Sequence, residues 1–410
     1  MVECKDMKEL KEGWKKVKLE KVAKYINTKI TTSGLCKKNY ISTENMISNR
    51  GGVLLSSSIP QNIKVNKFEK KDILFSNIRT YFKKLWKAKF EGGASSDVLI
   101  LRSLDSKKVI NEYLYYALSQ EEFFNYTVNT SKGTKMPRGD KDAIMKYEFL
   151  IPENTEIQKK IASILSAFDD KIEINNEMNK TLEEMAETFF KRWFIDFDFQ
   201  NENGEPYKSS GGKMVDSELG EIPEGWEVRE LKSVLENRKE KINNQKAKVL
   251  SAVNTGELKL SEEYFTKQVF SKDISKYIQV SKYDFAYNPS RINIGSIGIF
   301  EEDYIGAVSP IYVVFRAENT YHWYFKYLIK TSNLRKEINS RAFGSVRQSL
   351  SYKDFSLIKV AYPSQDIISH FNNIYEILYK NQKKLIKEIQ FLTEIRDTLL
   401  PKLMSGEVEA

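Results

Sequence analysis

Four stretches of the chain gather basic, amide and aromatic side chains that can form hydrogen bonds at a surface. Two lie in the first third of the sequence, at residues 77–84 and 131–138, and two lie further on, at residues 288–293 and 341–348. Arginine can bond both acceptors on the edge of guanine, asparagine and glutamine can read adenine, and lysine mostly meets phosphate. These residue types therefore point to contact with a nucleic acid.

The candidate DNA-contacting residues are the members of these stretches whose side chains have that capacity. In the first half of the chain they are Asn77, Arg79, Tyr81, Lys83, Lys84, Lys132, Lys135 and Arg138. In the second half they are Asn288, Arg291, Asn293, Arg341, Arg347 and Gln348. Any one of them can equally be a solvated surface residue. The stretches count for more, because each pair falls at equivalent places in two copies of a repeat.

The repeat has an offset of 211 to 212 residues and covers almost the whole chain. Gly13-Trp14 opens the first copy and Gly225-Trp226 opens the second, and Gly133 and Pro152 are spaced as Gly344 and Pro363 are. Two copies at so long a period indicate two domains, because solenoids use short periods and several copies.

The front part of each copy mixes strands and helices. Short apolar runs such as 97–101 and 311–315 predict strands, Gly pairs predict turns, and helices are expected around residues 111–125 and 321–338. The expected fold class is therefore α+β, with two pseudo-repeated α/β globules.

The back part of each copy carries apolar residues at spacings of three and four, which predicts a coiled-coil-like seam. A helix of roughly 39 residues would be about 58 Å long. Each stripe can instead be core against its own domain, but we favour two long helices packed against each other, the second ended by Pro401 and then Gly406. The residues expected in the seam and in partner docking are Ile157, Ile161, Phe168, Met185, Phe189, Leu385, Leu392 and Leu399.

These patterns divide the chain into five parts. The expected parts are a globule at 1–155, a long helix at 156–198, a polar, turn-rich linker at 199–220, a second globule at 221–363, and a second long helix with a tail at 364–410. Two globules on a rigid spacer reach two separate patches of a duplex. Because the globules differ in sequence, the predicted target is bipartite and asymmetric.

The net charge of +9 is distributed unevenly. Residues 1–155 hold 29 basic and 18 acidic side chains, whereas residues 156–200 hold 6 and 10. A basic block with interleaved aromatic residues is typical of a nucleic-acid reader, although a merely basic surface is the alternative. No apolar run approaches the length of a membrane span, and two cysteines build no disulfide framework, so a cytoplasmic protein is expected.

Motifs for catalysis on DNA are missing from the sequence. It has no Gly-x-Gly loop after a strand and no phosphate-binding Gly-Lys-Ser/Thr loop, so neither a cofactor nor a catalytic residue is expected in the chain. Tyr287-Asn288-Pro289-Ser290 only partly matches an adenine-methyltransferase motif, and we interpret it as a loop at a strand end. Asp196 and Asp198 follow an aromatic helix end and are interpreted as a turn. With two Cys and two His, no metal site is expected.

Four segments resemble the specificity (S) subunits of type I restriction-modification systems. They are residues 72–79 (Asp-Ile-Leu-Phe-Ser-Asn-Ile-Arg), Gly133 to Pro152 followed by 158–162, residues 219–228 around Ile-Pro-Glu-Gly-Trp226, and the tail 396–407. The resemblance implies two target-recognition domains, two long antiparallel helices, and double-stranded DNA with a bipartite target as ligand. It also implies two methyltransferase (M) subunits and restriction (R) subunits as partners, which would hold the methyl donor, ATP and Mg.

Two departures from the family pattern concern details. The second helix entry, Tyr362 to Asp366, lacks the Glu-x-Gln-Lys start that the first keeps, and Met136 stands where many members carry a polar residue. Two rival functions remain. An architectural coiled-coil protein that spaces two protein-binding domains would show no sequence-dependent DNA affinity, and a self-sufficient methyltransferase or nuclease would need the missing motifs.

Overall fold

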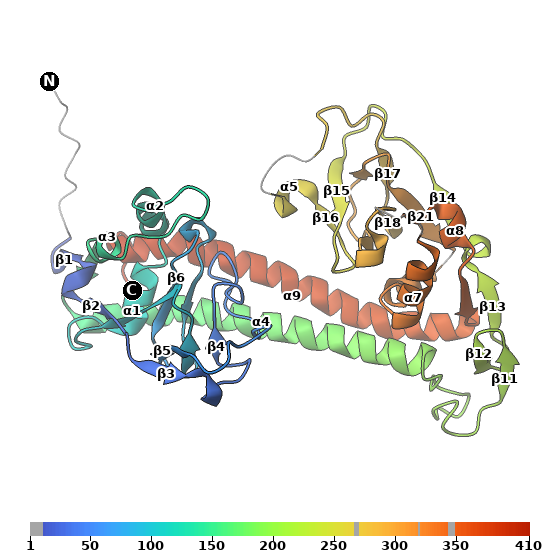
Figure 1. Ribbon diagram of the computed structural model, residues 1–410, viewed down its shortest axis with the longest axis horizontal. Coiled ribbons are helices and arrows are strands. Elements are labelled where there is room, and N and C mark those ends of the chain that lie inside the picture. The colour runs from blue at the N-terminus through green and yellow to red at the C-terminus, as the bar shows by residue number, and fades with distance from the viewer. Residues whose placement is uncertain (1–10, 266–269, 319, 343–348) are drawn as a thin grey trace. The chain divides into compact units, whose positions relative to one another are not determined.

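A computed structural model gives the structure of the protein over residues 11–265, 270–318, 320–342 and 349–410. The chain divides into two units (Figure 1). Unit 1 consists of Met1–Glu177 and Ile386–Ala410, and unit 2 consists of Met178–Leu385. Both long helices contribute one segment to each unit, so this division differs in kind from the five consecutive parts expected from the sequence.

Unit 1 is built on two four-stranded sheets. One has the strand order β2-β9-β6-β7 and is antiparallel, and the other has the order β3-β5-β8-β4, with β4 parallel to β8. The strands are β1 (Trp14–Lys18), β2 (Ala23–Tyr25), β3 (Lys29–Thr31), β4 (Tyr40–Ile41), β5 (Lys64–Phe68), β6 (Ile73–Ser76), β7 (Leu85–Lys87), β8 (Gly92–Ala94), β9 (Val98–Ser103) and β10 (Glu148–Pro152), the last paired with β1. The helices are α1 (Asn111–Ala117), α2 (Glu121–Asn129) and α3 (Lys141–Met145), with 3-10 turns η1 (Leu19–Lys21), η2 (Thr32–Gly34) and η3 (Thr80–Phe82).

Unit 2 repeats this plan. Its antiparallel sheet has the order β14-β21-β18-β19 and its mixed sheet has the order β16-β15-β20-β17. The strands are β11 (Met214–Ser217), β12 (Gly220–Pro223), β13 (Glu227–Glu230), β14 (Leu235–Arg238), β15 (Lys248–Ala252), β16 (Leu258–Leu260), β17 (Ile278–Val280), β18 (Asp284–Tyr287), β19 (Ile297–Ile299), β20 (Gly306–Val308), β21 (Val313–Ala317) and β22 (Lys359–Tyr362), which pairs with β13. The helices are α5 (Ser261–Tyr264), α6 (His322–Leu328), α7 (Ser332–Arg341) and α8 (Tyr352–Ser356), with turns η4 (Leu231–Ser233) and η5 (Ile292–Ile294).

The two units differ at the edge of the mixed sheet. In unit 1 the extra strand β3 adds beside β5, whereas in unit 2 the extra strand β16 adds beside β15, which takes the place of β4. The predicted α+β fold with pseudo-repeated globules is confirmed. The single helices expected around 111–125 and 321–338 are each two helices, α1 with α2 and α6 with α7.

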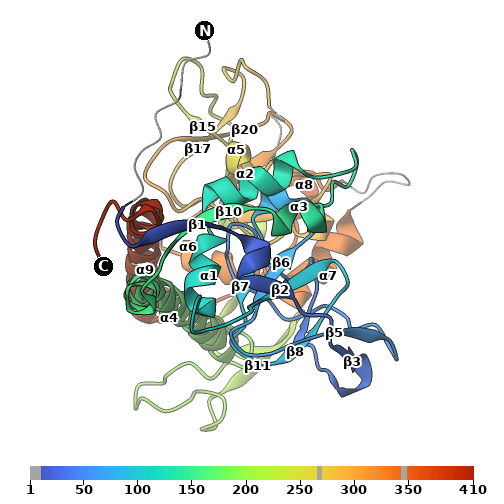
Figure 2. The ribbon, with the colours of Figure 1, turned by 90° about the vertical axis from the view of Figure 1, so that its left-hand side faces the viewer.

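The two long helices are α4 (Thr155–Phe194) and α9 (Gln365–Ser405), and they run antiparallel in both units (Figures 1 and 2). In unit 1 the guanidinium of Arg396 donates to Asp169 at 2.7 Å, and Lys171 pairs with Glu388. In unit 2 the rings of Phe190 and Phe371 lie 6.3 Å apart. The predicted antiparallel helix pair is therefore confirmed.

Of the two residues expected to end the second helix, Gly406 does so and Pro401 does not. Helix α9 continues through Pro401 to Ser405, and Gly406 follows with a φ of 75°. Proline lacks the N–H that would bond the carbonyl four residues earlier, and this usually ends or bends a helix. Here Leu400, Leu403 and Met404 are buried in the core of unit 1, and their burial outweighs the lost hydrogen bond.

The segment expected as a linker also carries structure. Phe199 stacks on Tyr207 with 4.7 Å between ring centroids and on Trp226 with 5.7 Å, and strands β11 and β12 form a hairpin just behind it. The polar composition of this segment correctly predicts turns, but it does not indicate that Phe199 and Tyr207 pack against one another. These two rings attach the segment to the core of unit 2.

Candidate nucleic-acid interface

A buried ion pair fixes the start of the same strand in both units. In unit 1 the carboxylate of Asp72, 1% exposed, accepts from Arg102 Nε at 2.6 Å. In unit 2 Asp284 accepts from Arg316 Nε at 2.7 Å. These pairs join β6 to β9 and β18 to β21 and so hold the strands whose far ends carry the candidate loops.

The two candidate stretches of unit 1 lie side by side. The backbone N–H of Arg79 donates to the carbonyl of Pro137 at 2.8 Å, and Gly139 donates to the carbonyl of Asn77 at 3.0 Å. Residues 132–138 form a small hairpin in which Lys132 and Arg138 exchange backbone hydrogen bonds. Sequence stretches more than fifty residues apart therefore make one surface.

Several predicted contact residues of unit 1 are bonded to other parts of the fold or buried in it. Lys84 donates to the carbonyl of Thr43 at 2.6 Å, and burial lowers the pKa of its ammonium group. Lys83 pairs with Glu121 at 2.6 Å, which joins the loop to α2. Asn77 is buried. The sequence cannot separate these side chains from exposed ones, because all of them are polar and lie outside the apolar periodicity.

Other predicted residues of unit 1 lie at the surface. Tyr81 is 47% exposed, with its ring 4.7 Å from that of Phe82, and Lys135 is exposed. Lys132 pairs with Asp140 at 2.5 Å and Arg138 pairs with Asp97 at 3.0 Å, yet both basic side chains stay largely exposed. A hydrogen bond from Lys132 lowers the pKa of Asp140. Exposed ion pairs of this kind exchange readily for phosphate, because each is worth little in water.

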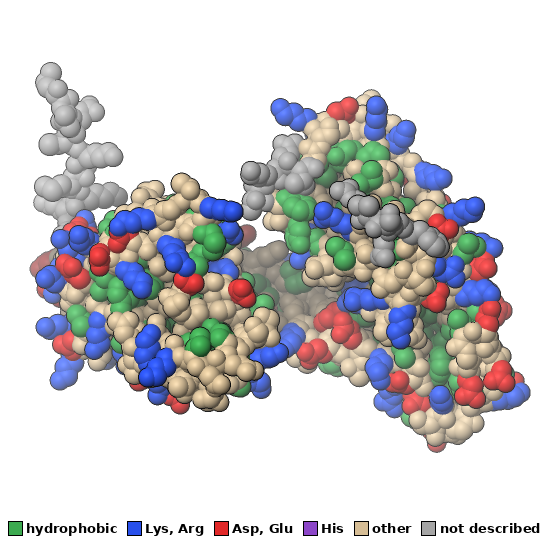
Figure 3. All heavy atoms as spheres, viewed as in Figure 1, with side chains coloured by type: hydrophobic (Ala, Val, Ile, Leu, Met, Phe, Trp, Pro, Cys, Tyr) green, Lys and Arg blue, Asp and Glu red, His purple; other side chains and the backbone are tan. Residues whose placement is uncertain are grey.

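In unit 2 the candidate residues follow β18. Arg291 is exposed, Asn293 is half-buried, and Asn288 accepts the backbone N–H of Ser290 at 3.1 Å, which shapes the turn. Arg341, at the end of α7, pairs with Glu337 at 3.3 Å. Arg347 and Gln348 lie outside the described residues. Figure 3 shows basic and acidic side chains interspersed over the visible face, so no single basic patch marks the interface there.

The comparisons with known proteins agree on one family. A model of the "Type I restriction modification DNA specificity domain" matches residues 11–184. The type I restriction enzyme MjaIX specificity subunit of Methanocaldococcus jannaschii is 28% identical over 315 residues, which cover 73% of this chain and 69% of that protein. The HindI specificity subunit of Haemophilus influenzae is 24% identical over 368 residues, covering 73% and 78%. The chain is therefore similar to type I specificity subunits over about three quarters of its length.

A solved specificity subunit shares the fold. The crystal structure of the type I restriction-modification system S subunit from M. genitalium matches this chain with a TM-score of 0.57 and 16% sequence identity, over 98% of each chain. The predicted fold is thus confirmed, and the resemblance carried by residues 72–79 and 133–162 falls inside the range that the family model matches.

The predicted helix residues divide between buried, half-buried and exposed positions. Ile161 and Leu385 are buried, and the half-buried members of the predicted set are Ile157, Phe168, Phe189, Leu392 and Leu399. Met185, predicted for the seam and partner docking, is 42% exposed, and its neighbour Ala186 is buried. A spacing of three or four residues tolerates a shift of one position, so the apolar pattern alone does not separate these two neighbours.

An apolar stripe remains exposed on α4. It consists of Ile164, Ile174, Met178 and Met185. Ile164, Met178 and Met185 are spaced at multiples of seven residues, which places them along one side of a helix. In the part of the chain that the structure describes, no group of three or more His, Cys, Asp or Glu side chains is placed to hold a metal ion, and no helix is long and apolar enough to cross a membrane.

Proposed function

We propose that this chain selects the DNA target of a type I restriction-modification complex and that its own residues catalyse no step. One observation carries the proposal: two units share a backbone plan and present different side chains on matching loops. Tyr81 in η3 corresponds to Asn293 in η5, and Lys83 corresponds to Gly295. A shared frame with different contact residues suits a reader of two different half-sites.

The target of such a reader is bipartite and asymmetric double-stranded DNA. Residues 1–155 act as one recognition domain and residues 221–363 as the other, each contacting its half-site through the loops after β6 or β18. Because the two sets of side chains differ, their preferred bases differ as well. A homodimeric reader would instead favour a palindrome.

The long helices are the proposed docking element for partner subunits. An exposed row of Ile164, Ile174, Met178 and Met185 is costly in water and matches an apolar face on a partner helix. Two methyltransferase subunits fit a pseudo-repeated helix pair, and restriction subunits would join them. The methyl donor, ATP and Mg belong to those partners, and a subunit that reads chromosomal DNA works in the cytoplasm.

Methylome sequencing tests this function. The chain is expressed with its neighbouring methyltransferase in a host without other adenine methylation, and the same methyltransferase alone is the control. A gapped, asymmetric motif methylated on adenine only in the presence of the chain is the expected result. Identical methylation in both strains contradicts the proposal and favours an architectural coiled-coil protein that spaces two protein-binding domains.

A further inference from the structure

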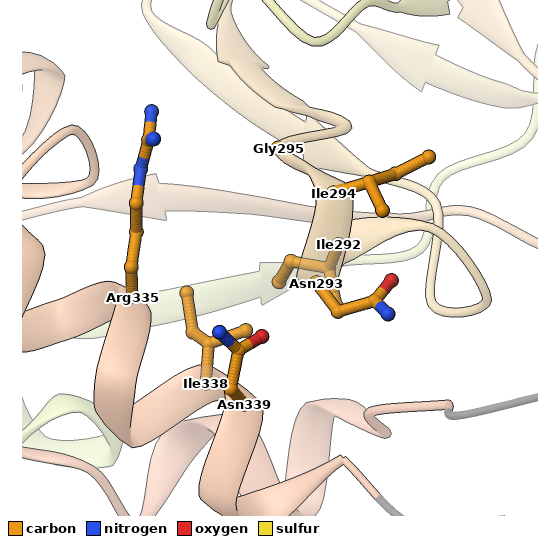
Figure 4. A pocket seen from close by; sticks show the side chains of 7 residues that line it. All are labelled: Ile292, Asn293, Ile294, Gly295, Arg335, Ile338 and Asn339. Carbon is orange, nitrogen blue, oxygen red and sulfur yellow. The ribbon is translucent and has the colours of Figure 1, made fainter.

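Unit 2 has a hollow between turn η5 and helix α7, beside the candidate loop (Figure 4). It measures about 220 Å³ and is lined by Ile292, Asn293, Ile294, Gly295, Arg335, Ile338 and Asn339. Water occupies about 30 Å³ per molecule in the liquid, so the hollow has room for more than a single water. Arg335 and Asn339 are not among the residues that the sequence singled out.

The floor of the hollow is apolar and its rim is polar. Ile292 and Ile338 are buried, whereas Arg335 and Asn339 are exposed on α7. Residues four apart lie on the same side of a helix, so both side chains border the hollow together. Figure 4 shows them rising from α7 opposite the residues of η5. Ile294, at the outer edge, is 63% exposed.

The same place in unit 1 is built differently. There α2 packs on η3, and the ion pair between Lys83 and Glu121 bridges the gap. At the repeat offset, Lys83 corresponds to Gly295 and Glu121 to Ser332, so unit 2 lacks both charges. Phe124, 1% exposed and packed near Phe75, corresponds to Arg335. The hollow thus results from particular substitutions rather than from the fold.

The two rim side chains have unused hydrogen-bonding capacity. Among the described residues, neither the guanidinium of Arg335 nor the amide of Asn339 has an ion pair or a hydrogen-bond partner. Glu337 is the next acidic residue after Arg335 on α7, and it is paired with Arg341. A planar guanidinium beside an amide matches the edges of guanine and adenine, and an exposed isoleucine suits the methyl group of thymine.

We propose that this hollow is the base-reading site of unit 2, in which Arg335 specifies a guanine and Asn339 contacts a neighbouring base. Four residues of helix advance about 6 Å, which is less than two base-pair steps of B-DNA. Arg335 and Asn339 therefore address adjacent positions of one half-site. This inference rests on the proposed function and adds to it the residues that determine one half of the target.

Substitutions on α7 test the inference in the assembled complex with its methyltransferase. Arg335→Ala removes the planar guanidinium with its paired N–H donors, and Arg335→Lys keeps the charge without those paired donors. Lys336→Ala, on the same helix, removes one positive charge away from the hollow. Methylome sequencing of each strain identifies the tolerated bases. Binding of the complex to duplexes with single-base changes, measured by fluorescence anisotropy, gives the discrimination at each position.

The expected result is confined to one half-site. Arg335→Ala and Arg335→Lys both relax one guanine position, with discrimination reduced about 5- to 150-fold, and Asn339→Ala relaxes a neighbouring position of the same half-site. Lys336→Ala keeps the wild-type motif. Thermal unfolding of each complex serves as a folding control, and because the substituted side chains are exposed, the melting temperatures should agree.

Three outcomes would overturn the inference. An unchanged motif in the Arg335→Ala strain shows that the arginine is merely solvated. If Arg335→Ala instead weakens binding equally on all sequences, reduces the salt slope by about 1, and Arg335→Lys restores the binding, Arg335 contacts a phosphate. If the wild-type complex itself methylates no specific motif, the proposed function fails and this inference fails with it, and the wild-type strain alone reveals that case.

Discussion

The loops that follow β6 and β18 have the same backbone plan and different side chains. In both, a buried residue opens a 3-10 turn, Thr80 in η3 and Ile292 in η5, and the turn ends in a left-handed residue, Lys83 with φ 52° or Gly295 with φ 89°. The buried pairs of Asp72 with Arg102 and of Asp284 with Arg316 hold both frames. The difference teaches that the frame is kept while the contact surface varies.

Beside its turn, unit 1 has an ion pair and a buried aromatic ring, and unit 2 has a hollow. Unit 2 has neither the pair nor the ring at the corresponding positions. Unit 1 presents Tyr81 outward there, whereas unit 2 presents Arg335 and Asn339 around an apolar floor. The two units therefore differ in the kind of contact they offer as well as in the residues that make it.

An exchange of Phe124 and Arg335 between the two copies should have the largest effect on stability. Phe124→Arg places an unpaired charge in the core of unit 1 and is expected to cost about 4 kcal/mol or more. Arg335→Phe alters an exposed side chain and should change stability by about 0.5 kcal/mol at most. Hydrogen exchange, read separately on peptides of each unit along a denaturant series, measures both effects.

The contrast between the two variants is the test. We expect Phe124→Arg to reduce protection from hydrogen exchange in unit 1 alone and Arg335→Phe to reduce it in neither unit. This result would support a buried ring in unit 1 and an open hollow in unit 2. Equal costs for both substitutions would show that Arg335 is as embedded as Phe124 and that the hollow is not open in solution. Arg335→Phe should also relax the same half-site as Arg335→Ala.

The sequence predicts the frame far better than the contact surface. The repeat offset, the strand runs and the long apolar stripes follow from local patterns, and all of them appear in the structure. The hollow depends on what is missing, since Gly295 and Ser332 stand where Lys83 and Glu121 form a bridge. Placing the two copies in register and noting this lost ion pair is the signal that would have drawn attention to Arg335.

Burial and internal bonding of some candidate contact residues escape the sequence for a related reason. Lys84 and Asn77 have the right chemistry for DNA, but the structure turns Lys84 to a backbone carbonyl and buries Asn77. Residue type states what a side chain can bond, and only the fold decides whether a backbone group has already taken that bond. The exposure of Tyr81 and Arg291 likewise follows from the turns that carry them and not from their residue types.

Each unit also has a carboxylate of α4 bonded by a tyrosine of its globule, and this comparison predicts an effect of pH. In unit 1 Tyr116 donates to Asp169 at 2.7 Å, and in unit 2 Tyr327 donates to Glu183 at 3.3 Å, alongside Lys330 at 2.9 Å. Burial raises the pKa of Glu183, but the charges of Lys330 and Lys326 and the bonds from Lys330 and Gln382 outweigh it, so the net pKa is lowered.

A lowered pKa in the folded state fixes the sign of the effect. Glu183 contributes stability above its ordinary pKa, and this contribution is lost as the pH falls through the lower folded value. Glu183→Gln should therefore reduce the acid dependence of unit 2 and cost less than about 1 kcal/mol at pH 7. Denaturant unfolding between pH 3 and 7, read by hydrogen exchange, measures this, with Glu184→Gln as the control for the charge change. An unaltered acid dependence in Glu183→Gln contradicts the assignment.

The smallest expected effect concerns the arginines that precede the two turns. Arg79 has φ 51° and lies in the left-handed region, whereas Arg291 has φ −139°. The left-handed conformation costs a non-glycine residue roughly 1–2 kcal/mol, and glycine adds about 0.5–1 kcal/mol of chain entropy. Arg79→Gly should therefore stabilise unit 1 by about 0.5 kcal/mol, and Arg291→Gly should destabilise unit 2 by a similar amount.

Opposite signs are the decisive feature, because a general effect of removing an arginine would have the same sign in both units. The side chain of Arg79 adds to the expected gain, since its buried Nε has no hydrogen-bond partner among the described residues. Paired denaturant curves of the two variants, read on peptides of each unit, resolve the difference. Destabilisation by Arg79→Gly would mean that contacts of Arg79 outweigh the strain, and the two turns would then differ in what holds their backbones as well as in what their surfaces present.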